Sequence, residues 1–359
     1  MESELDLYDI LQEMHVVATR PDLYPLLVEL NAVPSLLGLM RHDNTDVAIT
    51  VVHLLEELTD VDAVHEGEEW GAEVLVQALA DGHVVALLVH HLERLDPGTA
   101  EEREMMENLF DSLCSCLLLS ANRERFLQGE GVQLMNLMLR AKRVSRSSAL
   151  KVLDHAMLGP EGTGSCDMFV DILGLRTLFP LFMKSPRKIK KAGSTEKEHE
   201  EHVCSILASL LRNLTGQRRA RLLGKFAEND SEKVDRLMEL HFKYLDAVQE
   251  ADKKMDAGKD YGVLRGEVLD SDAEEELSLR RLDAGLFVLQ HICYVMAEIC
   301  NAEAPQIRQR VHQTLNMRGS SIDVVRDIVK EYAESIGDGS SQEFKESEQQ
   351  RILGLLVTL

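Results

Sequence analysis

The feature that most constrains the fold of this chain is a short apolar phrase that occurs three times with the same spacing. In each copy two apolar residues precede a small pivot residue, which is Ala32, Gly131 or Gly174. Apolar residues then follow one, four, seven and eight positions later. Steps of three and four residues mark one face of an α-helix, and a small pivot permits a tight turn into that helix. The phrase therefore predicts a repeating unit of a short helix, a turn and a longer apolar helix.

The spacing of the copies is typical of a helical solenoid. Gly131 and Gly174 lie 43 residues apart, and armadillo and HEAT repeats have periods of ~40–47 residues. A weaker copy is centred on Asp81, and polar insertions at residues 60–69 and 96–104 account for its larger offsets. A unit of this size cannot bury its apolar face alone, so it must stack on a neighbour.

A second phrase follows the first and predicts a third helix in each unit. Residues 53–59 align with residues 209–215, and an apolar pair four residues apart recurs at Leu113 and Leu117. In an armadillo unit the third helix lines the concave face. The expected fold class is therefore all-α, an armadillo/HEAT-type right-handed solenoid with an irregular helical C-terminal cap. An irregular helical bundle with chance periodicity is the alternative.

The chain is expected to have three parts. These are armadillo-type repeats over residues 1–257 with an insertion loop at 184–198, a Gly/Asp-rich linker at 258–273, and a C-terminal helical cap at 274–359. Cap helices are expected over residues 274–300, 305–316, 322–336 and 343–356. The basic cluster from Arg187 to Lys191 is either a nuclear-import signal or a solvated Lys-rich loop.

Both ends of the sequence are apolar. The first helix, expected over residues 5–19, carries the apolar pattern of an inner repeat, which favours a longer relative with more helices before it. The last eight residues, 352–359, are apolar up to the terminus and must pack somewhere. They are expected either to dock onto the cap or to contact a second subunit in a homodimer.

The composition favours a soluble, intracellular protein with basic partners. There are 39 basic and 62 acidic side chains, a formal net charge of −23, which disfavours direct binding to the phosphate backbone of nucleic acid. The acid excess either attracts basic partners or simply keeps the solenoid soluble. No apolar stretch approaches the ~18 residues of a membrane span. The six cysteines have neither zinc nor disulfide spacing.

No catalytic motif emerges from the sequence. There is no nucleophile elbow, phosphate-binding loop or dinucleotide fingerprint. His199 and His202 are three residues apart and lack the spacing that places two zinc ligands on one helical face. We therefore expect no enzymatic activity, no cofactor and no metal, and a scaffold or peptide-binding function instead.

The repeat phrases carry a resemblance to a known family. Residues 30–59 resemble the armadillo consensus, and together with residues 175–183, residues 204–215 and the irregular C-terminus they make residues 5–359 similar to the beta-catenin-like armadillo proteins. The resemblance implies a nuclear, non-enzymatic adaptor of the pre-mRNA splicing machinery, in the complex built around the cell-division-cycle-5-like protein. It also implies binding of partners through basic, nuclear-localisation-type segments, which agrees with the acid excess.

The groove chemistry departs from that of armadillo-type import receptors. There, a Trp and an Asn four residues later on the third helix hold a basic peptide, whereas only Asn213 matches that pattern here. Carboxylates are expected to bind the basic peptide instead. The alternative for each of them is a solvated charge on the helix surface. The candidate peptide-binding residues are Glu56, Glu57, Asp111, Asp154 and Asn213. The alternative function is a structural scaffold that assembles through apolar contacts of the C-terminal tail and first repeat.

Overall fold

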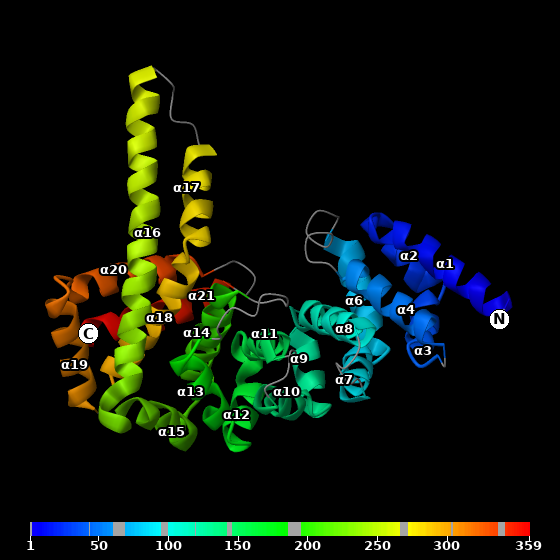
Figure 1. The fold of residues 1–359 in the computed structure, drawn as a ribbon, viewed down its shortest axis with the longest axis horizontal. Coiled ribbons are helices and arrows are strands. Elements are labelled where there is room, and N and C mark those ends of the chain that lie inside the picture. Colours follow the sequence, from blue (N-terminus) through cyan, green and yellow to red (C-terminus); the bar gives the residue numbers. More distant parts are fainter. Residues whose placement is uncertain are drawn as a thin grey trace. The chain divides into compact units, whose positions relative to one another are not determined.

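The computed structural model describes residues 2–42, 44–59, 69–94, 100–118, 120–141, 146–185, 195–265, 272–302, 304–336 and 342–359. Within these ranges the secondary structure is helical, with no β-strand, which confirms the all-α class (Figure 1). The described residues form two compact units, the first ending at Thr177 and the second beginning at Leu178.

Unit 1 is a succession of short and long helices. In chain order they are α1 (Glu2–Ala18), η1 (Pro21–Leu23), α2 (Tyr24–Glu29), α3 (Ala32–Leu39), α4 (Thr45–Leu58), α6 (Glu69–Asp81), α7 (Val84–Arg94), α8 (Ala100–Leu118), α9 (Ser120–Gln128), α10 (Gly131–Arg140), α11 (Arg146–Met157), η2 (Pro160–Gly162) and α12 (Thr163–Asp171). Helix α13 (Leu175–Met183) begins at the end of unit 1 and lies mostly in unit 2.

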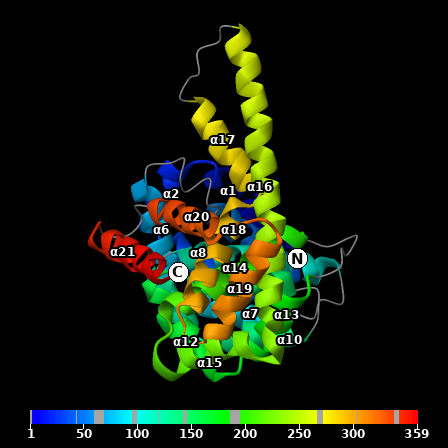
Figure 2. The ribbon, with the colours of Figure 1, turned by 90° about the vertical axis from the view of Figure 1, so that its left-hand side faces the viewer.

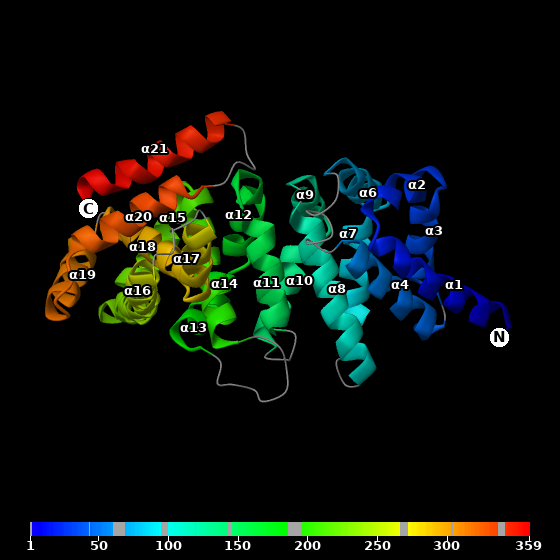
Figure 3. The same cartoon turned by 90° about the horizontal axis from the view of Figure 1, so that it is seen from above.

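These helices form three-helix repeats whose third helices stack. The repeats are α2–α3–α4, α6–α7–α8 and α9–α10–α11. Helix α1 packs on α4, α4 on α8, and α8 on α11, so these helices form one row (Figure 3). The predicted third helices are thereby confirmed.

The tight turn of each repeat is made one residue earlier than the sequence suggested. The backbone takes a positive φ at Asn31, Glu130 and Leu173, with values of 59°, 60° and 65°. Each of these residues directly precedes its Ala or Gly pivot. The left-handed conformation is uncommon for residues other than glycine, and the repeat places it at a non-glycine position.

The pivot glycines have a different task, which is to admit an aromatic ring. A Cβ atom built on Gly131 would lie 2.2 Å from the ring of Phe126, and one on Gly174 would lie 2.5 Å from the ring of Phe169. Both rings are completely buried. The small pivot therefore lets the first helix of the repeat pack its aromatic side chain directly against the start of the second helix.

The weaker copy of the repeat lies three residues later than predicted. His83 has the positive φ, 58°, and helix α7 starts at Val84. The pivot position is thus Val84, whereas Asp81 is the last residue of α6. The proposed insertion at residues 96–104 is also partly helical, because α8 begins at Ala100.

Unit 2 contains the remaining helices. They are α14 (Glu196–Asn213), α15 (Gly216–Ala227), η3 (Asn229–Ser231), α16 (Glu232–Arg265), α17 (Asp272–Asp283), α18 (Leu286–Cys300), α19 (Pro305–Met317), α20 (Ile322–Glu334) and α21 (Gln342–Thr358). The insertion loop is shorter than the predicted 184–198, because Thr195 and Glu198 form a capping box at the start of α14. Residues 186–194, including the cluster from Arg187 to Lys191, lie outside the described residues.

Helix α18 is the centre of unit 2. Helices α14, α16, α17, α19, α20 and α21 all pack against it (Figure 2), and every residue of α18 except Phe287 is buried. A helix that is buried on all sides is a core helix. The predicted single helix 274–300 is in fact two, α17 and α18, separated at Gly285. This glycine has a φ of 102°, and a Cβ there would lie 2.5 Å from the ring of Tyr244.

The predicted linker also differs from the structure. Helix α16 continues to Arg265 and α17 begins at Asp272, so both edges of the predicted linker 258–273 are helical, while residues 266–271 lie outside the described part. Figure 1 shows α16 running far past the core of unit 2 with α17 beside it. The division into repeats up to residue 257 and a cap from residue 274 stays a prediction.

A buried ion network ties the last helix to α18. The Glu298 carboxylate is 1% exposed and accepts hydrogen bonds from Arg351 at 2.9 Å and Arg219 at 2.7 Å. Arg351 also bonds Glu348 at 2.8 Å, and Arg212 reaches Glu348 at 2.7 Å. Burial acts to raise the pKa of Glu348, but hydrogen bonding from Arg351 and the charge of Arg212 lower it below its usual range. Because a buried charge is tolerated only with partners, these arginines fix the position of α21.

The apolar tail docks onto its own unit, as one of the two sequence-based alternatives expected. Ile352 is completely buried and Leu359 is 2% exposed, and the Arg308 guanidinium donates to the Leu359 carbonyl at 3.0 Å. Leu353 and Val357 remain 44% and 83% exposed. Docking therefore uses only one face of α21.

The ring-on-pivot contact predicts the effect of a single methyl group. Gly131→Ala pushes a Cβ into the Phe126 ring and is expected to lower the free energy of unfolding by about 1–3 kcal/mol, the usual cost of overpacking. Gly38→Ala is the matched control, since Gly38 lies within α3 with no atom within 4 Å of the new Cβ. It is expected to stabilise by about 0.5–1 kcal/mol. Urea unfolding followed by circular dichroism measures both, and equal effects would contradict the contact.

Candidate functional site

The row of third helices offers one exposed stripe per helix. The remaining faces are covered, because each third helix packs on its neighbours and on the helices of its own repeat. On α4 the uncovered residues include Asp46, His53, Glu56 and Glu57. On α8 they include Arg103, Glu107, Asp111 and Ser115, and on α11 Lys151 and His155. The carboxylates thus lie on α4 and α8, whereas α11 is neutral to basic.

Two of the predicted carboxylates pair with a neighbouring helix of the row. The Glu57 carboxylate contacts the His15 ring of α1 at 2.7 Å, and Asp111 accepts a hydrogen bond from Lys151 of α11 at 2.9 Å. The Glu57 and Asp111 side chains are 47% and 50% exposed. Exposed pairs of this kind contribute little stability, so these carboxylates are accessible to competing basic groups.

The other predicted residues differ in their burial. Asp154 is 9% exposed and lies among the core residues of α11, so it is not on the exposed stripe, and its part in peptide binding stays a prediction. Glu56 is half-buried on α4, beside Glu57. Asn213 is the half-buried last residue of α14, which belongs to unit 2. Within unit 1 the structure therefore places Glu56, Glu57 and Asp111 on adjacent helices and buries Asp154.

The positions that hold a Trp and an Asn in import receptors face the core on α8 and α11, whereas on α4 they are the half-buried His53 and the exposed Glu57. Ser112 and Cys116 on α8 are each 1% exposed, and Val152 and Ala156 on α11 are completely buried. Short side chains at these positions allow the third helices to pack closely. A basic peptide on α8 or α11 would therefore meet the exposed stripe, because the ladder positions of these two helices are buried.

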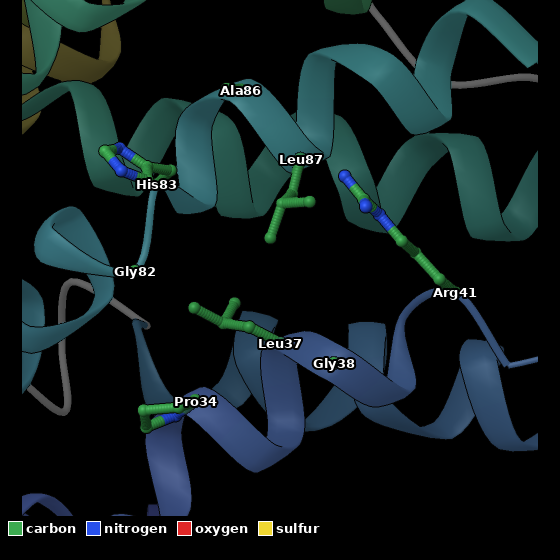
Figure 4. A pocket seen from close by; sticks show the side chains of 8 residues that line it. All are labelled: Pro34, Leu37, Gly38, Arg41, Gly82, His83, Ala86 and Leu87. Atoms are coloured by element: carbon green, nitrogen blue, oxygen red, sulfur yellow. The ribbon is translucent and has the colours of Figure 1, made fainter.

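A hollow of about 510 Å³ opens between the second helices α3 and α7. Figure 4 shows the Leu37 and Leu87 side chains extending into it, with Arg41 at one end and His83 at the other. It exists because the remaining lining residues are small or lack a long side chain, namely Pro34, Gly38, Gly82 and Ala86. The hollow is apolar with a basic rim and contains no carboxylate.

The groups that resemble catalytic residues are buried and structural. The Cys293 thiol lies 3.5 Å from Nδ1 of His241, and both side chains are fully buried. Burial raises the pKa of Cys293 and lowers the pKa of His241 to about 4, so the ion pair needed for a nucleophile does not form. Within the described ranges no three His, Cys, Asp or Glu residues are placed to hold a metal ion.

The hydropathy of the helices gives one borderline result. None of the helices in the described part is by itself long and apolar enough to cross a membrane, and one bent pair, Val74–Asp81 with Val84–Leu92, passes by length and composition only.

Glu200 is a buried acid that sequence reasoning passed over as part of a charged stretch. Its carboxylate is 3% exposed and accepts hydrogen bonds from Ser185 at 2.6 Å and from Lys243 and Tyr244, both at 2.7 Å. Burial alone would raise the pKa of Glu200, but these donors lower it. The neighbouring His199 ring lies 3.1 Å from the Leu181 carbonyl. Both residues join α14 to its neighbours. Their burial could not be predicted from the sequence, because a polar segment has no apolar helical periodicity that would mark its buried positions.

A row of stacked third helices with shorter first and second helices defines an armadillo-type solenoid. Comparison with known proteins agrees, because residues 1–98 and 95–330 match the family model described as "Catenin-beta-like, Arm-motif containing nuclear". The chain therefore belongs to this family.

Relatives with curated names extend the comparison. Beta-catenin-like protein 1 of Homo sapiens is 62% identical, with 99% of this chain and 80% of that protein covered. The beta-catenin-like protein 1 homolog of Schizosaccharomyces pombe is 27% identical, with 94% and 73% covered. Among solved structures, a designed armadillo repeat protein is 12% identical, with a TM-score of 0.48 and 90% and 99% of the two chains covered.

The buried imidazole predicts a pH dependence of stability. The folded pKa of His241 is about 4 against ~6.5 in an unfolded chain, so below pH 6.5 the unfolded state binds more protons and stability falls. Between pH 7 and pH 5 we expect a loss of about 2 kcal/mol from this group. His241→Gln is expected to remove this contribution to the dependence of the unfolding free energy on pH, whatever the substitution does to the unfolding free energy at pH 7. His83→Asn, at an exposed position, is the control, and an identical pH slope in all three proteins would contradict the assignment.

Proposed function

We propose that the stripe formed by Glu56, Glu57 and Asp111 on the third helices α4 and α8, together with the neighbouring Asp46 and Glu107, binds basic segments of other proteins. These five residues form the acidic stripe. The observation that carries the proposal is the stacking of α4 on α8, which places exposed carboxylates of two repeats on adjacent helices. A scaffold or adaptor role follows from family membership, and the basic partner is the finer proposal.

The charge distribution supports a basic partner over an acidic one. The formal net charge of −23 produces a field that attracts cationic segments and speeds their encounter. Two basic groups, His15 and Lys151, each already contact one carboxylate of the acidic stripe. An incoming Lys or Arg would exchange with these partners at small cost, because both pairs are substantially exposed.

The cellular setting is proposed on the family. Its description as nuclear supports a nuclear location. We propose further that the basic segments belong to pre-mRNA splicing proteins, including the cell-division-cycle-5-like protein. Neither nucleic acid nor a membrane is part of this proposal.

A peptide-binding measurement tests the acidic stripe. Fluorescence anisotropy with a labelled Lys/Arg-rich peptide is expected to show binding that weakens as salt rises, since salt screens exposed charges. The triple variant Glu56→Lys, Glu57→Lys and Asp111→Lys is expected to weaken binding by about tenfold or more, at roughly 0.2–1 kcal/mol per exposed pair lost and added repulsion.

The control has the same charge change at another place. Glu250→Lys, Asp323→Lys and Asp327→Lys alter three exposed carboxylates of unit 2, so the net charge of the two variants is equal. Equal loss of affinity in both variants would show a general charge effect and remove the acidic stripe from the proposal. Salt-insensitive binding would do the same.

The alternative function is assembly through apolar contacts, and one observation favours it. Leu353 and Val357 of α21 are exposed although the rest of the tail is docked. We propose on this basis a homodimer through the C-terminal region as the second candidate.

Light scattering tests the dimer. Leu353→Glu with Val357→Lys leaves the net charge unchanged and is expected to convert a dimer to a folded monomer, because neither side chain is buried within its own unit. Deleting residues 352–359 is less informative, since it also removes the buried Ile352 and Leu359. A monomeric mass for the unmodified chain would exclude this candidate.

A further inference from the structure

The family match is interrupted inside the chain. The family model matches residues 1–98 and, separately, residues 95–330, so the two matched segments overlap at residues 95–98. The alignment with the human relative is 451 positions long, whereas this chain has 359 residues. The relative therefore contains residues within the aligned region that this chain lacks. The junction of the two matches lies between α7, which ends at Arg94, and α8, which begins at Ala100.

The structure shows a complete repeat across this junction. Helices α6 and α7 come from the first matched segment and α8 from the second, yet α7 packs on α8 as the second and third helices of a repeat do. Their facing core is closed, because Leu88, Leu109 and Leu113 are completely buried. Helix α8 also packs on α4 of the preceding repeat and on α9 and α11 of the following one.

We propose that α6–α7–α8 is a hybrid repeat, in which the first two helices of one repeat of the longer relatives are joined to the third helix of a later repeat. The hybrid repeat places α8 directly beside α4 and makes the third-helix row shorter than in the relatives. The part of this inference that concerns peptide length rests on the proposed function of the acidic stripe.

The total difference in length from the human relative fits whole repeats. The relative's 451 aligned positions exceed the 359 residues here by roughly two periods of ~40–47 residues. A solenoid repeat contacts only its nearest neighbours. When whole repeats are removed, the second helix before the junction therefore packs on a third helix equivalent to its original one. Every later helix keeps its position as the first, second or third helix of a repeat. Removing part of a repeat would place a first or second helix where α8 stands.

The shortened row predicts a change in the ligand. Packed helices are ~8–10 Å apart and an extended chain advances ~3.3 Å per residue, so each third helix in the row corresponds to about three peptide residues. A row shorter by two third helices accommodates a basic segment that is about six residues shorter. The carboxylates of α4 and α8, which lie on adjacent helices here, would be separated in the relatives.

Hydrogen exchange tests the hybrid repeat. Three proteins are compared: this chain, a form that carries the human relative's additional internal segment at residue 96, and a form that carries only about 20 residues of it, half of the ~40–47-residue period. In the first two proteins we expect the backbone amides of α8 to exchange as slowly as those of α11. In the third protein we expect the α8 amides to exchange at least tenfold faster. Rapid exchange of α8 in this chain beside protected α11 amides would overturn the inference. So would full protection of α8 in the half-repeat form.

Peptide length provides the second measurement. Lys/Arg-rich peptides of increasing length are titrated into this chain and the restored form, and the length at which affinity stops rising is expected to be about six residues greater in the restored form. The same limiting length in both forms would overturn the shortened row. If neither form binds any of the peptides, the proposed function and the peptide-length part fail together, while the exchange measurement still decides the hybrid repeat.

Discussion

The stacking of third helices is the contact on which unit 1 depends. Helix α8 has apolar residues on more than one side, and Leu109, Leu113 and Leu117 are completely buried because α4 and α11 pack on either side. No single repeat supplies both of those neighbours, so the order of the row comes from the chain's repetition. Only one stripe of each third helix is left for solvent. Any surface function of this row is therefore confined to residues such as Glu57 and Asp111.

Unit 2 follows a different principle, in which one apolar helix is surrounded by six others. The buried Glu298 carboxylate on α18 accepts hydrogen bonds from Arg219 and Arg351. The Glu200 carboxylate on α14 accepts hydrogen bonds from Lys243 and Tyr244. These carboxylates count toward the formal charge of −23 but are committed to internal pairs. The net charge therefore overstates the charge available for a partner, and the location of each acid matters more than the total.

Much of the helical architecture was predictable because it depends on local periodicity. The expected cap helices at 305–316 and 322–336 appear as α19 and α20 with ends shifted by one or two residues. The prediction failed at one glycine. The helix expected over 274–300 is broken at Gly285, where φ is 102°, and the Tyr244 ring lies in the space that a Cβ at this position would need. No pattern within residues 274–300 contains that information.

The candidate site was predictable only in part, for a related reason. Helical spacing placed Asp111 and Asp154 on third helices correctly, but a helix position is exposed or buried according to what packs on it. Asp111 lies beside solvent and Lys151, whereas Asp154 points among core residues. The pairing of Glu57 with His15 joins residues 42 positions apart and likewise depends on two helices lying side by side.

The sequence by itself determined the all-α class, the repeating pivot and the family, because each rests on short-range spacing or on the order of motifs along the chain. The tertiary structure decided the role of the pivot glycines, which admit Phe126 and Phe169 against the next helix. It also decided which acids are exposed, and how α7 and α8 complete one repeat across the junction of the two family matches. These features depend on atoms brought together by packing, and packing is a property of neighbours in space that sequence spacing does not specify.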